Sequence, residues 1–210
     1  MYTGWQAIHG LSEQKWQKVL IDSVKTPSYL GFPLPGFPPA ELQVAIMGSS
    51  NADGLREGFR FYGLVKSVCE ENGSRLTPDM QLLDFGTGWG RFARIFLKEF
   101  PPENILGIDV DKSLVDVCRN TFPYGRFEVV PALPPTTLPS DHFGLVVAYS
   151  VFSHLSETAA NAWIQEFSRI LRPGGVIAVT TQGRTFLDFC EGIRQRGDFD
   201  HPWHRNLAKS

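Results

Sequence analysis

Residues 82–90 read Leu-Leu-Asp-Phe-Gly-Thr-Gly-Trp-Gly. An apolar stretch runs into Asp84, and glycines then follow at alternate positions, as Gly86, Gly88 and Gly90. This pattern predicts a strand that turns tightly into a helix, with backbone amides able to lie against a small polar ligand. A glycine loop in this place is typical of proteins that bind nucleotide-like ligands.

The chain around this loop alternates between strand-like and helical patterns. Short apolar runs typical of strands lie at 81–85, 104–109, 126–130, 145–150 and 176–181. Between these runs, apolar residues recur at helical spacing. The alternation predicts an α/β fold with a mostly parallel, doubly wound sheet. Ligands of such sheets bind outside the carboxyl ends of the strands, where the strand order reverses, and the glycine loop falls there.

A proline-rich segment precedes this region. Residues 27–39 hold five prolines, with Phe32 and Phe37 between them. The segment must therefore be extended, because proline fixes the backbone and removes a hydrogen-bond donor. It is either a stiff connector or a wall of the ligand site.

We expect three parts along the chain. Residues 1–79 form a helical and Pro-rich cap, with one helix capped by Ser12 and a longer one capped by Asp53. Residues 80–197 form the ligand-binding domain with the parallel sheet, and 198–210 form a tail.

The composition excludes several classes of protein. Of the 210 residues, 42% are hydrophobic and 20% are charged, and the net charge is −2. These values are typical of a globular protein and give no reason to expect a nucleic acid or an anionic membrane as partner. We see no signal peptide and no run near the ~18 apolar residues of a membrane helix. The three cysteines form no CxxC pair, which favours free thiols and a cytoplasmic location.

Two classes of ligand compete for the glycine loop. Dinucleotide-binding loops prefer Gly-x-Gly-x-x-Gly, in which the third glycine comes three places after the second. In this chain Gly90 comes only two places after Gly88, and the bulky Trp89 stands between them. The spacing therefore disfavours a nicotinamide dinucleotide.

The stretch resembles the first motif of the class I S-adenosylmethionine-dependent methyltransferases, which reads Asp/Glu-x-Gly-x-Gly-x-Gly. The resemblance implies that S-adenosyl-L-methionine is the cofactor and that Asp84 holds its amino group, often through water. It also implies that the backbone of the loop lies along the methionine and ribose, with Gly86, Thr87, Gly88 and Gly90 as contacts. The physical chemistry agrees, because the cofactor carries an ammonium group and a carboxylate that suit an anion and free amides.

Further matches follow in the family's order over roughly residues 80–195. Asp109 ends the next strand, 19 residues after the last glycine, and a carboxylate there can bind both hydroxyls of a ribose. Val110 beside it would pack on the adenine. Residues 138–147 resemble the entry to the family's fourth strand, although its usual Asp is missing, and 172–175 resemble the turn into the fifth.

Other contacts are implied at the ends of later strands. After the third strand no side chain is an obvious partner for adenine, so the backbone of Ala132 and Leu133 would serve. Tyr149 and Ser150 end the fourth strand and would flank the sulfonium. An aromatic face beside a cation is favourable by about 0.5–2 kcal/mol.

His154 follows the fourth strand and should therefore lie near the methyl group. Methyl transfer depends mainly on alignment and a dry site, but a hydroxyl acceptor also profits from a base. We expect His154 to act as the general base or to orient the acceptor. The alternative is a histidine that only packs the loop. No spacing of residues indicates a metal site.

The C-terminal end departs from the family. Only 29 residues follow Thr181, whereas the family's sheet usually ends with two further strands. The fold is therefore expected to lack some C-terminal strands, and the open sheet edge favours a homodimer.

These observations favour methyl transfer from S-adenosylmethionine to a small-molecule acceptor, such as a glycan or a secondary metabolite. The first alternative is a non-catalytic module that binds S-adenosylmethionine or serves as a scaffold, which the short C-terminus supports. An NAD-dependent oxidoreductase is a weaker alternative because of the glycine spacing.

Overall fold

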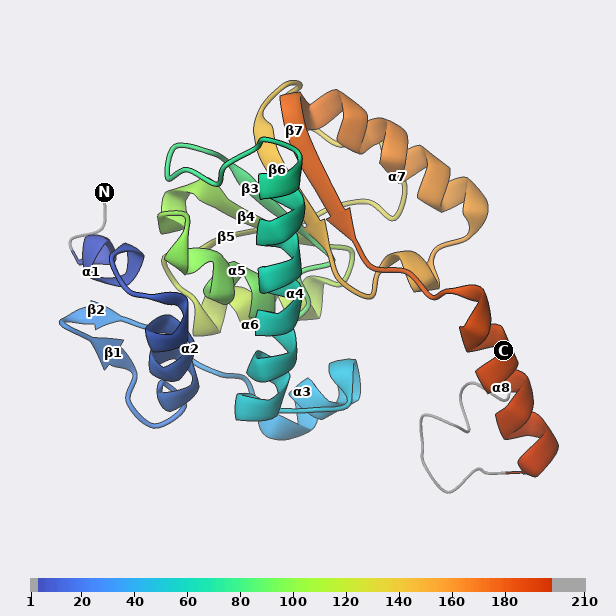
Figure 1. The fold of residues 1–210 in the computed structure, drawn as a ribbon, viewed down its shortest axis with the longest axis horizontal. Coiled ribbons are helices and arrows are strands. Elements are labelled where there is room, and N and C mark those ends of the chain that lie inside the picture. The colour runs from blue at the N-terminus through green and yellow to red at the C-terminus, as the bar shows by residue number, and fades with distance from the viewer. Residues whose placement is uncertain (1–3, 198–210) are drawn as a thin grey trace.

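A computed structural model describes residues 4–197, so the tail expected over 198–210 lies outside the described residues. Its centre is a five-stranded, fully parallel sheet with the strand order β5-β4-β3-β6-β7 (Figure 1). The strands are β3 (Leu82–Phe85), β4 (Ile105–Asp109), β5 (Arg126–Val129), β6 (Phe143–Ala148) and β7 (Leu171–Val179). The predicted mostly parallel α/β fold is confirmed.

Strand β3 lies in the middle of the sheet and pairs with β4 on one side and β6 on the other. The strand order therefore reverses at β3, and the glycine loop leaves the carboxyl end of this strand. A loop at such a reversal lies over a crevice between diverging connections, which is where open α/β sheets bind their ligands.

Helices cover both faces of the sheet, and each face has its own apolar cluster. One cluster joins Leu82 and Leu145 to α4 (Asn51–Glu71), α5 (Arg91–Ile95) and α6 (Lys112–Thr121). The other joins the opposite sides of the same strands to α7 (Glu157–Ile170). The central strands β3 and β6 are buried on both faces, as expected inside a parallel sheet, whereas the edge strands β5 and β7 are partly exposed.

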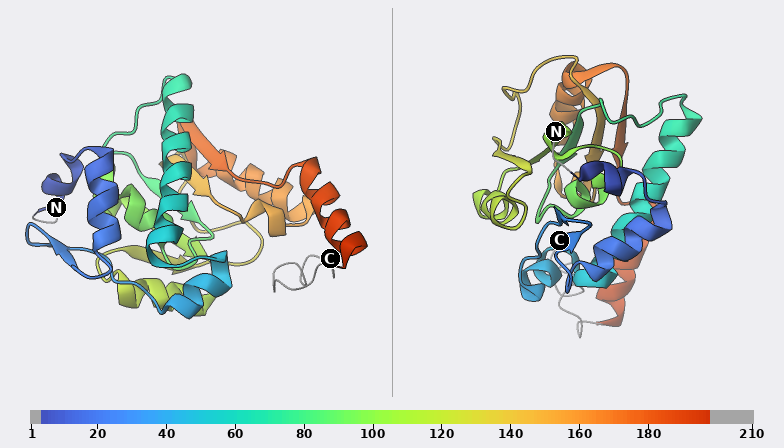
Figure 2. Two further views of the ribbon diagram at one scale, coloured as in Figure 1. Left: turned by 60° about the horizontal axis from the view of Figure 1, so that its bottom comes forward. Right: turned by 90° about the vertical axis from the view of Figure 1, so that its left-hand side faces the viewer.

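The N-terminal residues form α1 (Trp5–His9), α2 (Glu13–Asp22), a hairpin of β1 (Ser28–Tyr29) and β2 (Phe32–Pro33), and α3 (Ala40–Met47). Helix α1, helix α2 and the hairpin lie at the end of the molecule away from the C-terminal helix α8 (Arg184–Arg196) (Figure 2). Ser12 caps α2 as expected, since its hydroxyl accepts the Lys15 N–H at 3.2 Å.

Two indoles join this part to the sheet domain. Trp5 Nε1 donates to the Leu97 carbonyl at 2.7 Å, and Trp16 Nε1 donates to the Ile95 carbonyl at 2.8 Å. Both carbonyls belong to the end of α5 and the 3-10 turn that follows it, Phe96–Lys98. Carbonyls at a helix end lack partners within the helix, so the indoles satisfy groups that would otherwise be buried without a hydrogen bond.

Helix α4 begins three residues earlier than expected, so the prediction that Asp53 is its N-cap was wrong. Ser50 is the N-cap residue, and Asp53 lies in the first turn. The Asn51 N–H instead donates to Gln43 Oε1 at 2.8 Å, and Gln43 is fully buried. A side chain of the preceding helix thus caps α4, which a local sequence signal could not indicate.

The proline-rich segment packs behind the glycine loop. Phe32 is buried, and the Phe37 ring lies 5.9 Å from the Trp89 ring. The Tyr124 hydroxyl donates to the Pro33 carbonyl at 2.6 Å. The segment is therefore neither an exposed connector nor, as shown below, a wall of the cavity.

Arg94 fixes this arrangement from inside the core. It is fully buried, and its guanidinium donates to the carbonyls of Gly36 at 2.7 Å, Trp89 at 3.0 Å and Gly90 at 3.0 Å. The guanidinium also lies 4.4 Å from the Trp89 ring centre and 4.9 Å from that of Phe37. Burial lowers the pKa of Arg94 to about 10, so it stays charged at neutral pH.

The C-terminal end of the sheet differs in detail from the expected pattern. Strand β6 begins at Phe143 and not at Leu145, and β7 begins at Leu171, so it includes the turn expected at 172–175. The pairing of these two strands shifts in register between Phe143 and Leu145, which accommodates that turn as an irregularity. Within residues 4–197, β7 is the last strand, so its outer edge is open.

None of the described helices is both long enough and apolar enough to cross a membrane.

Glu166 anchors the loop before β6 to helix α7. Arg169 donates to both of its oxygens, at 2.6 and 3.0 Å, and the Thr136 N–H donates to it at 2.9 Å. These hydrogen bonds favour the carboxylate and lower the pKa of Glu166 to about 2. Since the pKa is lowered on folding, the stabilisation is present above pH ~4.5 and is lost as the pH falls towards 2.

We therefore expect Glu166→Gln to lower the free energy of unfolding by about 2–3 kcal/mol at pH 7, with a smaller difference from wild type at pH 3. Urea unfolding at the two pH values measures both effects. Glu157→Gln, an exposed position on the same helix, is the control and should cost under about 0.5 kcal/mol. A difference between wild type and Glu166→Gln that does not change with pH would contradict this assignment.

Candidate functional site

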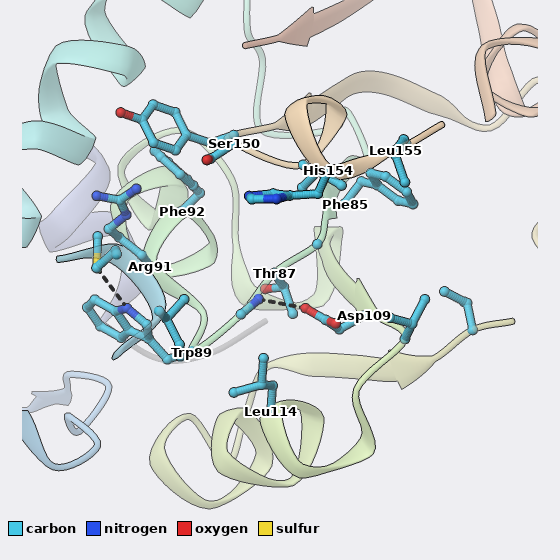
Figure 3. A pocket seen from close by; sticks show the side chains of 18 of the residues that line it. Phe85, Thr87, Trp89, Arg91, Phe92, Asp109, Leu114, Ser150, His154 and Leu155 are labelled. Atoms are coloured by element: carbon cyan, nitrogen blue, oxygen red, sulfur yellow. Dashed lines mark hydrogen bonds between the residues drawn. The ribbon is translucent and has the colours of Figure 1, made fainter. Parts of the chain in front are cut away.

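A cavity of about 610 Å³ opens at the carboxyl ends of β3, β4 and β6 (Figure 3). The glycine loop, Asp109 and the segment after β6 line it, and α3 and α4 contribute Met47 and Glu57. No residue of the proline-rich segment 27–39 lines it. The volume lies in the ordinary range for a small-molecule site.

The glycine loop takes a shape that needs its glycines. Gly86, Gly88 and Gly90 have φ angles of +68°, +55° and +77°, in the left-handed region. A Cβ on Gly86 would also lie 2.3 Å from a methyl carbon of Val151. This distance is a steric clash, so Val151 would have to move if Gly86 were replaced. The N–H groups of Gly86 and Thr87 donate to the Ile108 carbonyl at 2.9 and 3.0 Å, so these hydrogen bonds to β4 fix the conformation of the loop.

Asp109 stands where β4 ends, beside this loop, and lines the same cavity. Its Oδ2 accepts the Gly88 N–H at 2.9 Å, and its Oδ1 accepts the Asp111 N–H at 3.0 Å (Figure 3). Two backbone donors thus fix the orientation of this carboxylate. Asp111 itself caps α6 by accepting the Ser113 N–H at 2.8 Å.

Asp84 lies behind the loop and is not among the residues that line the cavity. It is 1% exposed, and its Oδ2 accepts the Thr87 hydroxyl at 2.8 Å and the Ala93 N–H at 3.1 Å. Burial raises its pKa to about 6. The carboxylate therefore ties the glycine loop to the first turn of α5.

Two other expected contacts also lie outside the cavity. Gly90 precedes α5 and faces Cys118 and Phe127. Leu133 projects to the surface and is 53% exposed. The remaining expected residues line the cavity: Gly86, Thr87, Gly88, Asp109, Val110, Ala132, Tyr149, Ser150 and His154.

The end of the cavity beside α4 holds a charged cluster that sequence reasoning missed. The Arg91 side chain is 7% exposed, and its Nη1 lies 3.1 Å from the Gly54 carbonyl and 3.6 Å from Glu57 Oε2. The Tyr149 hydroxyl donates to Glu57 Oε1 at 2.5 Å, and the Tyr149 ring centre lies 4.8 Å from the Arg91 guanidinium. Burial lowers the pKa of Arg91.

The residues after β6 approach the cavity from the other side of the loop. Ser150 has a φ of +60°, which is rare for a residue with a side chain, and its N–H donates to Thr180 Oγ1 at 2.7 Å. His154 ends the short 3-10 turn Phe152–His154, and its ring points into the cavity above the glycine loop (Figure 3). The described residues give the His154 ring no hydrogen-bond partner, so it can bind a ligand or acceptor.

Comparison with known proteins agrees with this geometry. Residues 82–175 match the family model described as a methyltransferase domain. A malonyl-[acyl-carrier protein] O-methyltransferase from Paenibacillus sp. is 28% identical over 139 residues, which are 63% of this chain and 50% of that protein. This chain thus spans about half the length of that curated relative.

Two solved structures share the fold. The YcgJ protein from Bacillus subtilis aligns over 66% of this chain and 58% of its own, with a TM-score of 0.53 and 20% identity. DesVI from Streptomyces venezuelae aligns over 70% of this chain and 58% of its own, with a TM-score of 0.52 and 22% identity. Residues 82–175, with the cavity at their strand ends, therefore match a methyltransferase domain, and the chain shares the fold of these two structures.

Proposed function

We propose that this chain binds S-adenosyl-L-methionine in the cavity and transfers its methyl group to a small-molecule acceptor. One observation supports the proposal most strongly. The glycine loop and Asp109 are joined by a hydrogen bond and line the same cavity, in the region that matches a methyltransferase domain. When bound, the sulfonium supplies an activated methyl group and a good leaving group. The protein's own residues then have to hold, orient and enclose the reactants.

The cavity residues fit the parts of such a ligand. The Asp109 carboxylate, fixed by two N–H donors, can accept hydrogen bonds from both ribose hydroxyls. Val110, Leu114 and Val130 form an apolar surface next to it that suits a flat base. The Ala132 carbonyl already accepts the Trp163 indole N–H at 3.1 Å. An adenine base would therefore form its hydrogen bonds with other backbone groups of this segment.

Aromatic side chains would keep water away from the reacting atoms. Phe85, Phe92, Tyr149 and Trp163 line the cavity around the loop. A dry, preorganised site is the main requirement for this displacement, because alignment supplies much of the rate enhancement. The face of the Tyr149 ring also favours a nearby cation.

A small recess of about 130 Å³ adjoins the cavity and would admit the acceptor. It is lined by Tyr149, Ser150, Ser153, Thr180, Thr181 and Gln182, which offer hydroxyl and amide groups. These groups suit a neutral, hydroxylated acceptor such as a glycan or a secondary metabolite. The second candidate for the acceptor is the malonyl group of an acyl carrier protein, which the name of the curated relative gives as that protein's substrate.

Release of S-adenosylhomocysteine across a library of acceptors tests the activity. Turnover with a hydroxylated acceptor and not with malonyl thioesters is expected. Cofactor binding without turnover on any acceptor would favour the alternative of a non-catalytic module, and no binding would contradict the proposal as a whole.

His154→Ala is expected to lower turnover at least tenfold while the affinity for S-adenosylmethionine stays within about twofold of wild type. The His154 ring points into the cavity and has no hydrogen-bond partner among residues 4–197, so its loss removes a proton acceptor but no contact to the glycine loop. Single-turnover kinetics and calorimetry measure the two effects. His142→Ala, an exposed histidine outside the cavity, is the control. Unchanged turnover of His154→Ala would remove the residue from the mechanism.

A further inference from the structure

A side chain continues the hydrogen-bond ladder between β6 and β7 at the point where the two strands reach the site. The Thr180 N–H donates to the Ala148 carbonyl at 3.0 Å, as in a regular parallel ladder. A regular ladder would next pair the Ser150 N–H with the Thr180 carbonyl. That N–H instead donates to Thr180 Oγ1 at 2.7 Å. Thr180 therefore holds the chain after β6 with its hydroxyl as well as with its backbone.

Ser150 needs such a partner because its backbone lies in the left-handed region. Its φ is +60°, a conformation that brings Cβ close to the carbonyl oxygen and is unfavourable for residues other than glycine. The residue lines both the cavity and the small recess beside it. A strained residue next to a site persists only where its surroundings hold it in place, and the Thr180 hydroxyl is one of the groups that do so here.

The conformation of Ser150 sets the direction of the turn that carries His154. Val151 follows at once and packs on the glycine loop, since a Cβ on Gly86 would lie 2.3 Å from Val151 Cγ2. The Ser150 carbonyl accepts the Ser153 hydroxyl at 3.3 Å, and the Val151 carbonyl accepts the His154 N–H at 2.9 Å. From this turn the His154 ring points into the cavity (Figure 3). A change of Ser150 to an ordinary negative φ would redirect the whole segment.

Resting on the proposed function, we infer that Thr180 is a positioning residue for His154. Its hydroxyl keeps Ser150 in the left-handed conformation, and Ser150 in turn directs the His154 ring towards the adenosyl ligand. Thr180 is not among the residues that line the large cavity, so it acts there through Ser150. The end of β7 thereby takes part in the site through a single hydroxyl group.

The NMR signal of the His154 ring tests this inference without a methyl acceptor. The signal is identified by its loss in His154→Ala. S-adenosylhomocysteine is the probe, and calorimetry with the full chain gives its affinity. In wild type, saturation with the probe should shift the His154 signal. The ring of His142, which is exposed and lies outside the cavity, should give no shift.

Thr180→Val removes the hydroxyl and nearly keeps the shape of the side chain. The Ser150 N–H should then exchange with solvent about tenfold faster, because one hydrogen bond shifts such an equilibrium by about this factor. The probe-induced shift of His154 should fall to about half of the wild-type value or less, while the probe binds within about twofold of wild type. Thr180→Ser keeps the hydroxyl and should keep the wild-type behaviour. Thr185→Val, at an exposed position on α8, is the matched control.

The substitution Ser150→Gly tests whether Thr180 acts through Ser150. Glycine adopts the left-handed conformation without a steric penalty, so it depends less on the hydroxyl. Thr180→Val should therefore reduce the His154 shift less in a Ser150→Gly background than in the wild-type background.

The inference is overturned if Thr180→Val leaves the His154 shift as in wild type, or reduces it equally in both backgrounds. Binding of the probe to wild type without a shift of His154 would also overturn it. Should Thr180→Val not fold, wild type decides the matter, because exchange of its Ser150 N–H at the rate of a free amide contradicts the inference and slow exchange supports it. Failure of wild type to bind S-adenosylhomocysteine would instead contradict the proposed function, so the two failures are distinguishable.

Discussion

Replacing Arg94 with methionine is expected to lower the free energy of unfolding by about 3–5 kcal/mol. The guanidinium is fully buried and donates to the carbonyls of Gly36, Trp89 and Gly90. Methionine fills much of the volume but donates nothing, so buried carbonyls would lose their partners. The contacts with the Trp89 and Phe37 rings would also lose their cation.

Urea unfolding of Arg94→Met, Arg94→Lys and wild type measures this effect. Lysine keeps the charge but cannot reach three carbonyls with one ammonium group, so it should cost about 2 kcal/mol. Arg56→Met, at an exposed position on α4, should cost under about 0.5 kcal/mol. A loss below 1 kcal/mol in Arg94→Met would mean that Arg94 does not hold the proline-rich segment to the loop.

Asp109→Asn is expected to weaken S-adenosylmethionine binding on the order of 100-fold. The carboxylate accepts N–H groups of Gly88 and Asp111 with its two oxygens. An amide has only one oxygen, so its NH₂ group would face one of these donors. The variant thus disturbs the loop and removes a charged acceptor for the ribose.

Calorimetry gives this affinity directly. Asp111→Asn, two residues further on, is the matched control, because its side chain caps α6 and does not line the cavity. It should leave the affinity within twofold and change stability by under about 1 kcal/mol. Equal affinities of Asp109→Asn and wild type would show that the sugar lies elsewhere.

The parallel sheet and the glycine loop could be predicted because their signals are local in the sequence. Alternating strand and helix patterns determine a parallel sheet, and glycines at alternate positions require a tight turn wherever they occur. Asp109 could be placed because it follows β4 directly, at the same sheet end as the loop. These features depend on neighbours in the sequence, or on pairing rules that hold for all such sheets.

The charged cluster could not be predicted, because it depends on the path of α4 across the sheet. Glu57 precedes Arg91 by 34 residues, and Tyr149 follows it by 58, yet all three meet at one end of the cavity. The hydrogen bonds from Thr87 and Ala93 to the Asp84 carboxylate were likewise not predicted, because they depend on how the turn folds back on itself.

A crystal structure of the full chain with bound S-adenosylhomocysteine would show where the adenosyl ligand lies. We expect the ribose hydroxyls within hydrogen-bond distance of the Asp109 carboxylate and the base against Val110. A ligand bound with its ribose away from Asp109, or no bound ligand at saturating concentration, would contradict this expectation.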